Sequence, residues 1–290
     1  MPNSLKLPQW GASERALRNC PLPAQFQATH EAQLSALELG LSSEDFPGHL
    51  PLNPSTAQLG ELEALREKFG IEIPTCHLTT RLLANDPSDD AKQLALLKEQ
   101  IRIASELNIP SVNLILSDAP SASLEPADSD RALNGLNRLA EFTDGQHVRL
   151  ALLTNATLTS QAKGPPVYVE TLMTSRAFLT ELVDQLPPSC DIGYEPAMFK
   201  AVNPNDLRFG FDLVHTRVAF CILHDFRETK NGPQPVFPGQ DNLDFGQLFH
   251  SIKTPTPCLI AGPLGDEPAP GCLQARRAVE RQLTLWQQHN

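Results

Sequence analysis

The sequence predicts one α/β domain over residues 1–290, a (β/α)8 barrel with parallel strands inside and helices outside. Seven or eight short apolar segments alternate with amphipathic helical segments along the 290 residues, which is the order of parallel βα units. The segment from Val112 to Leu116 is apolar apart from Asn113, as expected for a strand covered on both faces. A nucleotide-binding open sheet is the weaker alternative, because neither a GxGxxG motif after the first strand nor a GxxxxGK motif occurs.

The composition disfavours two classes of partner. The formal net charge is -11 and no run of Lys or Arg occurs, so neither a nucleic acid nor a membrane surface is an expected partner. No segment reaches the ~18 apolar residues of a membrane span, and the opening residues lack the apolar stretch of a signal peptide. We therefore expect a cytoplasmic protein.

The six cysteines are widely spaced and form no CxxC pair, so a zinc or redox role is not expected. Cys76, Cys221 and Cys258 lie in apolar segments, where buried thiols act as small hydrophobic side chains. The 26 prolines gather between the periodic segments. They therefore mark the ends of elements in a folded domain and do not indicate disorder.

The strand and helix signals near the N-terminus are uneven. Residues 5–7 form a weak first strand, and residues 24–33 are expected to form a helix. Residues 34–39 alternate apolar with small or polar side chains, which fits either a strand or the end of that helix. A clearer helix is expected over 56–69, where leucines share one face and Gly70 provides the stop.

The next unit contains the strongest helix signal in the chain. Residues 71–77 are expected to form a strand that ends at His77. In the helix that follows, Ser88 can act as the cap, and Asp89 and Asp90 favour the positive end of the helix dipole. Apolar residues at helical spacing form its buried stripe.

The same alternation continues to the end of the chain. Its short apolar segments predict strands, and its segments with helical periodicity predict helices. The expected strands are 148–153, 192–194, 218–223 and 258–261, and the expected helices are 130–142, 175–186, 205–214, 245–252 and 275–288.

Active sites of parallel αβ barrels lie at the carboxyl ends of the strands, so the residues just beyond each strand are candidates. Glu195 follows an apolar strand in DIGYEPAMFK, and Pro196 removes the next backbone donor. Ionisable groups are otherwise sparse at these ends, whereas a catalytic divalent metal needs several carboxylate and imidazole ligands at one point. Spacing alone therefore predicts no metal centre.

Four segments carry a family resemblance. HVRLALLTN, DIGYEPAMF, RVAFCILHDF and LIAGPLGDEP follow one another in the chain and resemble consecutive motifs of the xylose isomerase-like TIM barrels, the sugar phosphate isomerase and epimerase family. The similarity runs from Val148 to the C-terminus and more loosely over 31–116. It implies a (β/α)8 TIM barrel with a sugar-shaped or polyol-shaped pocket, and members of the family use a divalent metal such as Mn, Mg, Co or Zn.

The family's metal is held by Glu, Asp, His and Glu at four strand ends. By this resemblance the four ligands fall on Leu153, Glu195, Ile222 and Ala261. Only the second position keeps a carboxylate, and the other three are hydrocarbon. The Lys of the third motif falls on His224, and the Asp of that motif is kept as Asp225. The resemblance therefore implies that the metal cofactor is lost here, together with its Lewis-acid chemistry.

Candidate site residues come from the strand ends and from these motifs. The catalytic candidates are Glu195, His77 and His224, and the substrate-binding candidates are Asn113, Asp118, Asn155, Lys200 and Asp225. Structural alternatives stand beside them, since His77 could be a hydrogen-bonded packing residue and Glu195 a turn residue or a strut. His224 and Asp225 are adjacent on a strand, so their side chains start toward opposite faces.

The hydrocarbon residues at the three other ligand positions would place apolar groups around the carboxylate of Glu195. Desolvation without a partner raises a carboxyl pKa, so we expect either a raised pKa for Glu195 or a nearby cation. The nearest candidates in sequence for that cation are His224, His77 and Lys200.

The resemblance and the lost ligands together imply a barrel with a sugar or polyol pocket and a binding, regulatory or complex-forming role. The alternative is an active sugar isomerase or epimerase. It would use rearranged ligands such as His77, Asp118 and Glu195, or metal-free acid–base transfer by Glu195 with His77 or Lys200. The DNA-repair endonuclease branch of the fold is disfavoured by the missing ligands and the acidic charge. A homo-oligomer or a protein partner is left open.

Overall fold

The computed structural model describes residues 8–42, 47–84, 86–206, 208, 210–241, 243–251, 256–263 and 268–289. Within them a parallel sheet follows the strand order β2-β1-β14-β11-β10-β7-β6-β5-β3-β4. Its strands are β1 (Trp10–Ala12), β2 (Ala36–Leu37), β3 (Leu39–Ser42), β4 (His49–Pro51), β5 (Cys76–Leu78), β6 (Ser111–Leu114), β7 (Arg149–Leu153), β10 (Cys190–Tyr194), β11 (Val218–Leu223) and β14 (Cys258–Ile260).

This sheet closes into a barrel through β2 and β3. Only Glu38 separates the two strands, and β2 pairs with β1 whereas β3 pairs with β5. The backbone N–H of Glu38 donates to the carbonyl of Ala12, and the N–H of Leu39 donates to that of Thr75. The two segments therefore act as one strand of the barrel wall. β4 pairs with β3 and takes no part in this closure.

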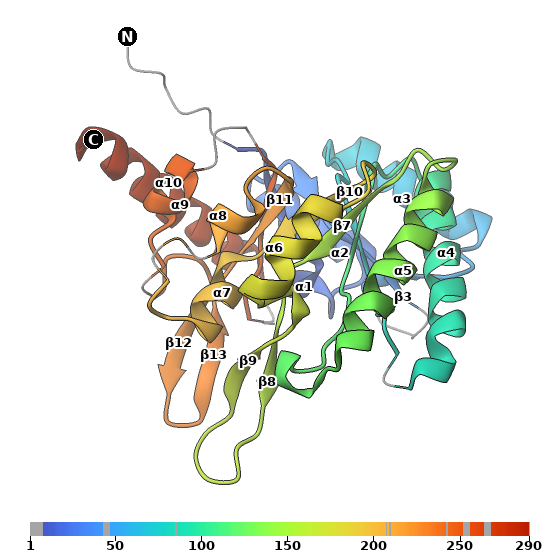
Figure 1. The fold of residues 1–290 in the computed structure, drawn as a ribbon. Helices are drawn as coiled ribbons and strands as arrows, with labels where there is room; N and C mark the ends of the chain where they lie inside the picture. The colour runs from blue at the N-terminus through green and yellow to red at the C-terminus, as the bar shows by residue number, and fades with distance from the viewer. Residues whose placement is uncertain are drawn as a thin grey trace.

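Helices cover the outside of the barrel wall (Figure 1). None of the described helices combines the length and the apolar composition that crossing a bilayer requires. The helices are α1 (Glu14–Leu17), α2 (Leu22–Glu31), α3 (Thr56–Phe69), α4 (Asp90–Glu106), α5 (Pro126–Thr143), α6 (Arg176–Gln185), α7 (Pro196–Val202), α8 (Phe211–Val214), α9 (Phe245–Ser251) and α10 (Pro268–His289).

Alternate strand residues divide the hydrophobic core in two. In β7, Leu152 packs under the helices, whereas Leu153 points into the barrel. The inward side chains form a separate group, the inner apolar cluster, which consists of Ile115, Ala151, Leu153, Phe220, Ile222, Leu259 and Ala261. A Cβ on Gly193 would lie 2.7 Å from the ring of Phe220. Any larger residue at this position would therefore force the Phe220 ring to move.

Two antiparallel hairpins project from the same end of the barrel (Figure 1). One is formed by β8 (Ala156–Thr159) and β9 (Val167–Glu170), and the other by β12 (Asp225–Thr229) and β13 (Gly232–Val236). They meet where the rings of Tyr168 and Phe226 pack with centroids 4.7 Å apart. The sequence reasoning missed both hairpins, which together build an aromatic wall at this end.

The structure confirms the barrel and corrects several of its elements. The strand expected over 5–7 lies outside the described residues, and the first described strand is Trp10–Ala12. The strand expected over 71–77 is confined to Cys76–Leu78. Ser88 was expected to cap the next helix, but that helix begins at Asp90 with Asp89 at the N-cap position, because Pro87–Asp89 forms a 3-10 helix.

The segment after β10 also differs from expectation. A helix was expected over 205–214, but only Phe211–Val214 of this range is helical among the described residues. A helix that the sequence reasoning did not foresee, Pro196–Val202, starts directly after Glu195. Proline fits the first position of a helix because its φ is already helical and its missing N–H is not needed there.

We expect the whole chain to unfold as one cooperative unit. The first strand, Trp10–Ala12, pairs with the last one, Cys258–Ile260, so separating the two ends of the chain would open the barrel and expose the inner apolar cluster. Urea unfolding followed by far-UV circular dichroism and by intrinsic fluorescence should give coincident transitions. A stable folded fragment such as 1–145 after limited proteolysis would contradict a single domain.

Candidate functional site

A cavity of about 950 Å³ opens at the carboxyl ends of the barrel strands, within the roughly 300–1,000 Å³ range of small-molecule sites. His77 lines it from β5, while Ile115, His224 and Ala261 line it from positions directly after β6, β11 and β14. The rest of the lining comes from α1 and its C-cap, β4, the loop after β5, α4, α7, the two hairpins and the residues after β14. Of the three catalytic candidates, His77 and His224 line this cavity, whereas Glu195 is not among its lining residues.

Glu195 lies at this end of the barrel, between β10 and α7, and is fully buried. The Nη1 atom of Arg15 donates to Oε1 of Glu195 at 2.7 Å. The Nδ1 atom of His224 lies 2.9 Å from the same oxygen. The other oxygen, Oε2, has no hydrogen-bond partner among the described residues. One cation and one imidazole thus converge on a single carboxylate oxygen.

This arrangement decides the protonation of Glu195. Burial alone would raise the pKa of the Glu195 carboxyl, but Arg15 and His224 together hold that pKa below its ordinary value. The expectation of a raised pKa for Glu195 is therefore wrong. The other expected outcome, a nearby cation, is the one observed. His224 was among the named candidates for it, whereas Arg15 was not. Lys200 lies in the last turn of α7, and no contact with Glu195 is recorded for it.

The short helix α1 holds Arg15 in place. Its N-cap is Ser13, whose side-chain oxygen accepts the backbone N–H of Arg15 at 3.3 Å. The Ser13 hydroxyl in turn donates to Oε2 of Glu38 at 2.5 Å, and the backbone N–H of Glu14 donates to the same atom at 3.1 Å. The buried carboxylate of Glu38 therefore fixes the start of α1, and with it the base of the Arg15 side chain.

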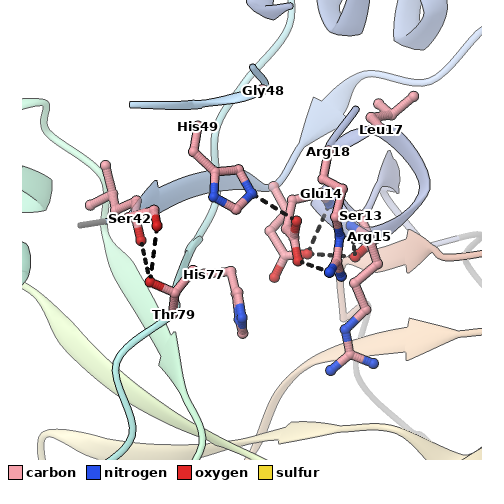
Figure 2. A network of polar contacts seen from close by, with 12 residues as sticks. Ser13, Glu14, Arg15, Leu17, Arg18, Ser42, Gly48, His49, His77 and Thr79 are labelled. Carbon is pink, nitrogen blue, oxygen red and sulfur yellow. Dashed lines mark hydrogen bonds and ion pairs between the residues drawn. The ribbon is translucent and has the colours of Figure 1, made fainter. Parts of the chain in front are cut away.

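Glu14, the first residue of α1, makes a second buried polar contact with His49 and also pairs with Arg18 (Figure 2). His49 Nε2 lies 3.1 Å from Oε2 of Glu14, and Arg18 Nη2 donates to Oε1 at 3.4 Å. Burial opposes ionisation, but the hydrogen bond from His49 and the charges of His77 and Arg18 lower the pKa of Glu14 to about 2. In Figure 2 the side chain of Arg15 extends away from this ion pair, in the same direction as the ring of His77.

Glu38 also orients His77 through Asn113. The Nδ2 atom of Asn113 donates to Oε1 of Glu38, so the Oδ1 atom of Asn113 is left to accept from Nδ1 of His77, 2.9 Å away. This network assigns the proton of a neutral His77 to Nδ1 and leaves Nε2 as an acceptor. Burial and the charge of Glu14 raise the pKa of Glu38 to about 7, whereas burial lowers the pKa of His77 to about 4.

The depressed pKa of His77 gives a testable pH dependence. The pKa of His77 falls from 6.5 to about 4 on folding, so the stability that depends on the neutral ring is complete above pH 6.5 and is lost as the pH falls toward 4, by on the order of 3 kcal/mol. We expect His77→Gln to remove this loss, as measured by urea unfolding at pH 7 and pH 4.5. Glu38 titrates in both proteins, so their difference isolates His77. Identical pH profiles would contradict the assignment.

The donor set does not fit the divalent metal that the family resemblance implies. Leu153, Ile222 and Ala261 belong to the inner apolar cluster, and none of them can donate a lone pair. The surviving carboxylate, Glu195, has one oxygen engaged by Arg15. Among the described residues, no group of three or more His, Cys, Asp or Glu side chains is arranged to hold a metal ion.

The five side chains expected to bind substrate are absent from the described lining of the cavity. Asn113 lies behind His77, and Asn155 donates to the Ser117 carbonyl at 3.1 Å and to Oδ1 of Asp118 at 3.4 Å. Asp118 binds Nε of Arg81 at 2.6 Å. Asp225 accepts the N–H groups of Phe226 and Leu243. Their contact with a ligand, like that of Lys200, stays a prediction.

The comparisons with known proteins agree on the fold. The model of the xylose isomerase-like TIM barrels matches residues 26–260. The solved structure of 3-keto-D-glucoside 4-epimerase YcjR from E. coli has a TM-score of 0.69 at 12% identity, covering 95% of this chain and 100% of that chain. A D-tagatose 3-epimerase-like protein has a TM-score of 0.72 at 15% identity, covering 97% and 99%.

A third similar structure contains a sugar. D-allulose 3-epimerase from Methylomonas sp., solved in complex with D-allulose, has a TM-score of 0.70 at 13% identity, covering 96% of this chain and 98% of that chain. No curated protein sequence matches this chain. At these identities the structural similarity establishes the fold alone.

Proposed function

The chain belongs to the xylose isomerase-like TIM barrel family, and we propose that it binds a sugar or polyol at the barrel mouth without a metal ion. In this proposal the barrel has a binding, regulatory or complex-forming role in place of metal-assisted isomerisation. Similar folds are found in sugar epimerases, one of them solved with D-allulose, which supports a ligand of monosaccharide size.

The observation that carries this proposal is the ion pair between Arg15 and Glu195. A guanidinium 2.7 Å from the buried carboxylate neutralises the one surviving ligand position, while the inner apolar cluster occupies the other three. A divalent cation at this place would lie beside the positive charge of Arg15 and would find hydrocarbon at the three other positions. This arrangement supports a site that works without a metal.

The cavity offers the two kinds of contact that a sugar needs. Thr79, Thr80 and Gln93 line it with hydroxyl and amide groups, which can exchange hydrogen bonds with sugar hydroxyls. Tyr168 and Phe226 line it with aromatic surface, which can cover the apolar face of a sugar ring. Small-molecule sites typically combine an apolar lining with a few polar groups in this way.

We expect Glu195→Gln to weaken sugar binding about tenfold, equivalent to about 1.4 kcal/mol, because the amide keeps the shape but loses the charge that orients Arg15. The measurement is isothermal titration in EDTA with D-fructose, D-allulose, D-sorbitol and D-gluconate as probes. A panel in which no sugar or polyol binds the wild-type protein would overturn the proposed function.

A matched control lies on the same strand. Asp191 in β10 pairs with Arg149 at 2.6 Å, which is not a lining residue, whereas Glu195 binds Arg15, which lines the cavity. Asp191→Asn should therefore leave sugar binding unchanged. If Glu195→Gln changes only the melting temperature and not sugar binding, Glu195 is a structural strut and its role in the site is refuted.

A second candidate function is metal-free isomerisation or epimerisation by proton transfer, and the geometry of His77 favours it. His77 lines the cavity, its ring is neutral at pH 7, and Nε2 has no recorded hydrogen-bond partner among the described residues. This nitrogen could take the proton from a carbon next to a sugar carbonyl and return it, while the electron pair of the broken C–H bond resides on the carbonyl oxygen.

Proton transfer can be measured apart from binding. Incubating the protein with D-fructose in D2O would place deuterium on the sugar carbon, which proton NMR detects, and His77→Gln would abolish the exchange. Asn113→Leu should slow it, because the His77 tautomer would no longer be fixed. Sugar binding without deuterium incorporation would refute this second function and leave the first intact.

A further inference from the structure

Helix α1 directs two guanidinium groups at the cavity. Arg15 and Arg18, the C-cap residue of α1, are three residues apart and both line the cavity, Arg15 beside Glu195 and Arg18 beside Glu14. Arg81, in the loop after β5, is the third arginine of the lining, whereas Glu14 is the one carboxylate residue in the described lining. Cationic side chains thus outnumber anionic ones on this wall, although the chain as a whole carries a net charge of -11.

The two arginines of α1 retain hydrogen-bond donors that the protein does not use. Among the described residues, the Arg15 guanidinium makes one recorded hydrogen bond, from Nη1 to Glu195. Arg18 reaches Glu14 through Nη2 at 3.4 Å, and its Nε atom is buried without a hydrogen-bond partner in the described part of the chain. Both guanidinium groups are partly accessible, with 22% of the Arg15 side chain and 37% of the Arg18 side chain exposed, so a ligand oxygen in the cavity can accept from the N–H groups that remain.

The chemistry of these donors selects the acceptor. Guanidinium groups present parallel N–H donors that match the paired oxygens of a carboxylate or phosphate, and such charge-assisted bonds are stronger than bonds to a neutral hydroxyl. We propose that Arg15 and Arg18 form an oxyanion subsite, so that the ligand of this barrel is a sugar or polyol derivative that carries a carboxylate or a phosphate. This inference rests on the proposed function.

Other residues of the lining fit the rest of such a ligand. Tyr168 and Phe226 present aromatic rings, and Met198 adds a thioether, so these side chains favour the ring or carbon chain over charge. Arg15 then has two roles, because it neutralises Glu195 and also contacts the ligand. Its guanidinium takes over the electrostatic position that the family resemblance gives to a metal cation.

Matched probes test the subsite. Isothermal titration in EDTA at constant ionic strength should give at least tenfold tighter binding for D-gluconate than for D-sorbitol, or for D-glucose 6-phosphate than for D-glucose. The first pair tests a carboxylate and the second a phosphate. Equal affinity within both pairs would overturn the oxyanion subsite but support the proposed function, whereas no binding by any of the four probes would overturn both.

Variants then assign the preference to residues. Arg18→Gln should reduce the preference for the anionic member at least fivefold while leaving the neutral member within twofold. Arg15→Lys keeps the charge beside Glu195 but loses the paired donors, so it should also reduce the preference. Arg138→Gln, on an exposed position of α5, is the control and should change neither affinity. An unchanged preference in both Arg18→Gln and Arg15→Lys would refute the assignment.

Discussion

Replacing Arg15 by alanine is expected to lower the free energy of unfolding by about 3–5 kcal/mol, the cost of leaving one partner of a buried ion pair uncompensated. Glu195 is fully buried, and Arg15 supplies the guanidinium that holds its pKa below the ordinary value. His224 would remain 2.9 Å away but cannot replace a permanent charge. Urea unfolding at pH 7.5 measures the loss.

A double variant separates the charge from the side-chain volume. Arg15→Ala/Glu195→Gln removes both charges, so most of the stability lost in Arg15→Ala should return. Millimolar methylguanidinium chloride should also raise the melting temperature of Arg15→Ala and not that of the double variant. Arg138→Ala is the surface control. If Arg15→Ala costs no more than Arg138→Ala, the ion pair does not stabilise the barrel mouth.

The second large effect is expected from a double variant that removes the guanidinium of Arg15 and introduces a carboxylate at position 153. Leu153 pairs in register with Gly193, two residues before Glu195, so a carboxylate at position 153 would point into the barrel beside Glu195 and His224. In Arg15→Ala/Leu153→Glu, two carboxylates and an imidazole could bind a divalent cation. Manganese at ~100 times its dissociation constant would stabilise this variant by roughly 2.7 kcal/mol, which corresponds to about 5–10 °C in melting temperature.

The matched control keeps the shape at position 153. Arg15→Ala/Leu153→Gln has an amide in place of the carboxylate, so manganese should shift its melting temperature by less than the error of the measurement. The wild-type protein should also show no shift. An equal shift in the wild type would mean that the natural chain already binds the metal and that Arg15 does not replace it.

The sequence predicted the fold, and it has hydrocarbon side chains at three positions where the family resemblance implies metal ligands. Apolar segments such as Val218–Leu223 and the capped helix Thr56–Phe69 with its stop at Gly70 are local signals, so their prediction was confirmed. The position of Leu153, Ile222 and Ala261 in one cluster agrees with the motif comparison that assigned all three to one site. Inward alternation along β7 and β11 brings these side chains together.

The cation beside Glu195 could not be found from the sequence, because it depends on contacts between distant segments. Arg15 lies 180 residues from Glu195, and it follows a strand of three residues, too short for a periodic pattern. Glu38 was within a segment considered as a strand. The hydrogen bonds that its buried carboxylate accepts come from Ser13 and Asn113, which are distant in the sequence. One signal was available: Ser13 precedes an arginine-containing turn as a possible N-cap.

Metal content is the most direct test of a site in which an arginine takes the place of the metal. The protein, expressed in medium supplemented with manganese, magnesium, cobalt and zinc and then desalted without a chelator, is analysed by inductively coupled plasma mass spectrometry. We expect far less than one equivalent of any divalent metal. The guanidinium of Arg15 binds the carboxylate of Glu195, and the three other ligand positions carry hydrocarbon side chains. Retention of about one equivalent would contradict the metal-free site and favour a metal-dependent isomerase or epimerase.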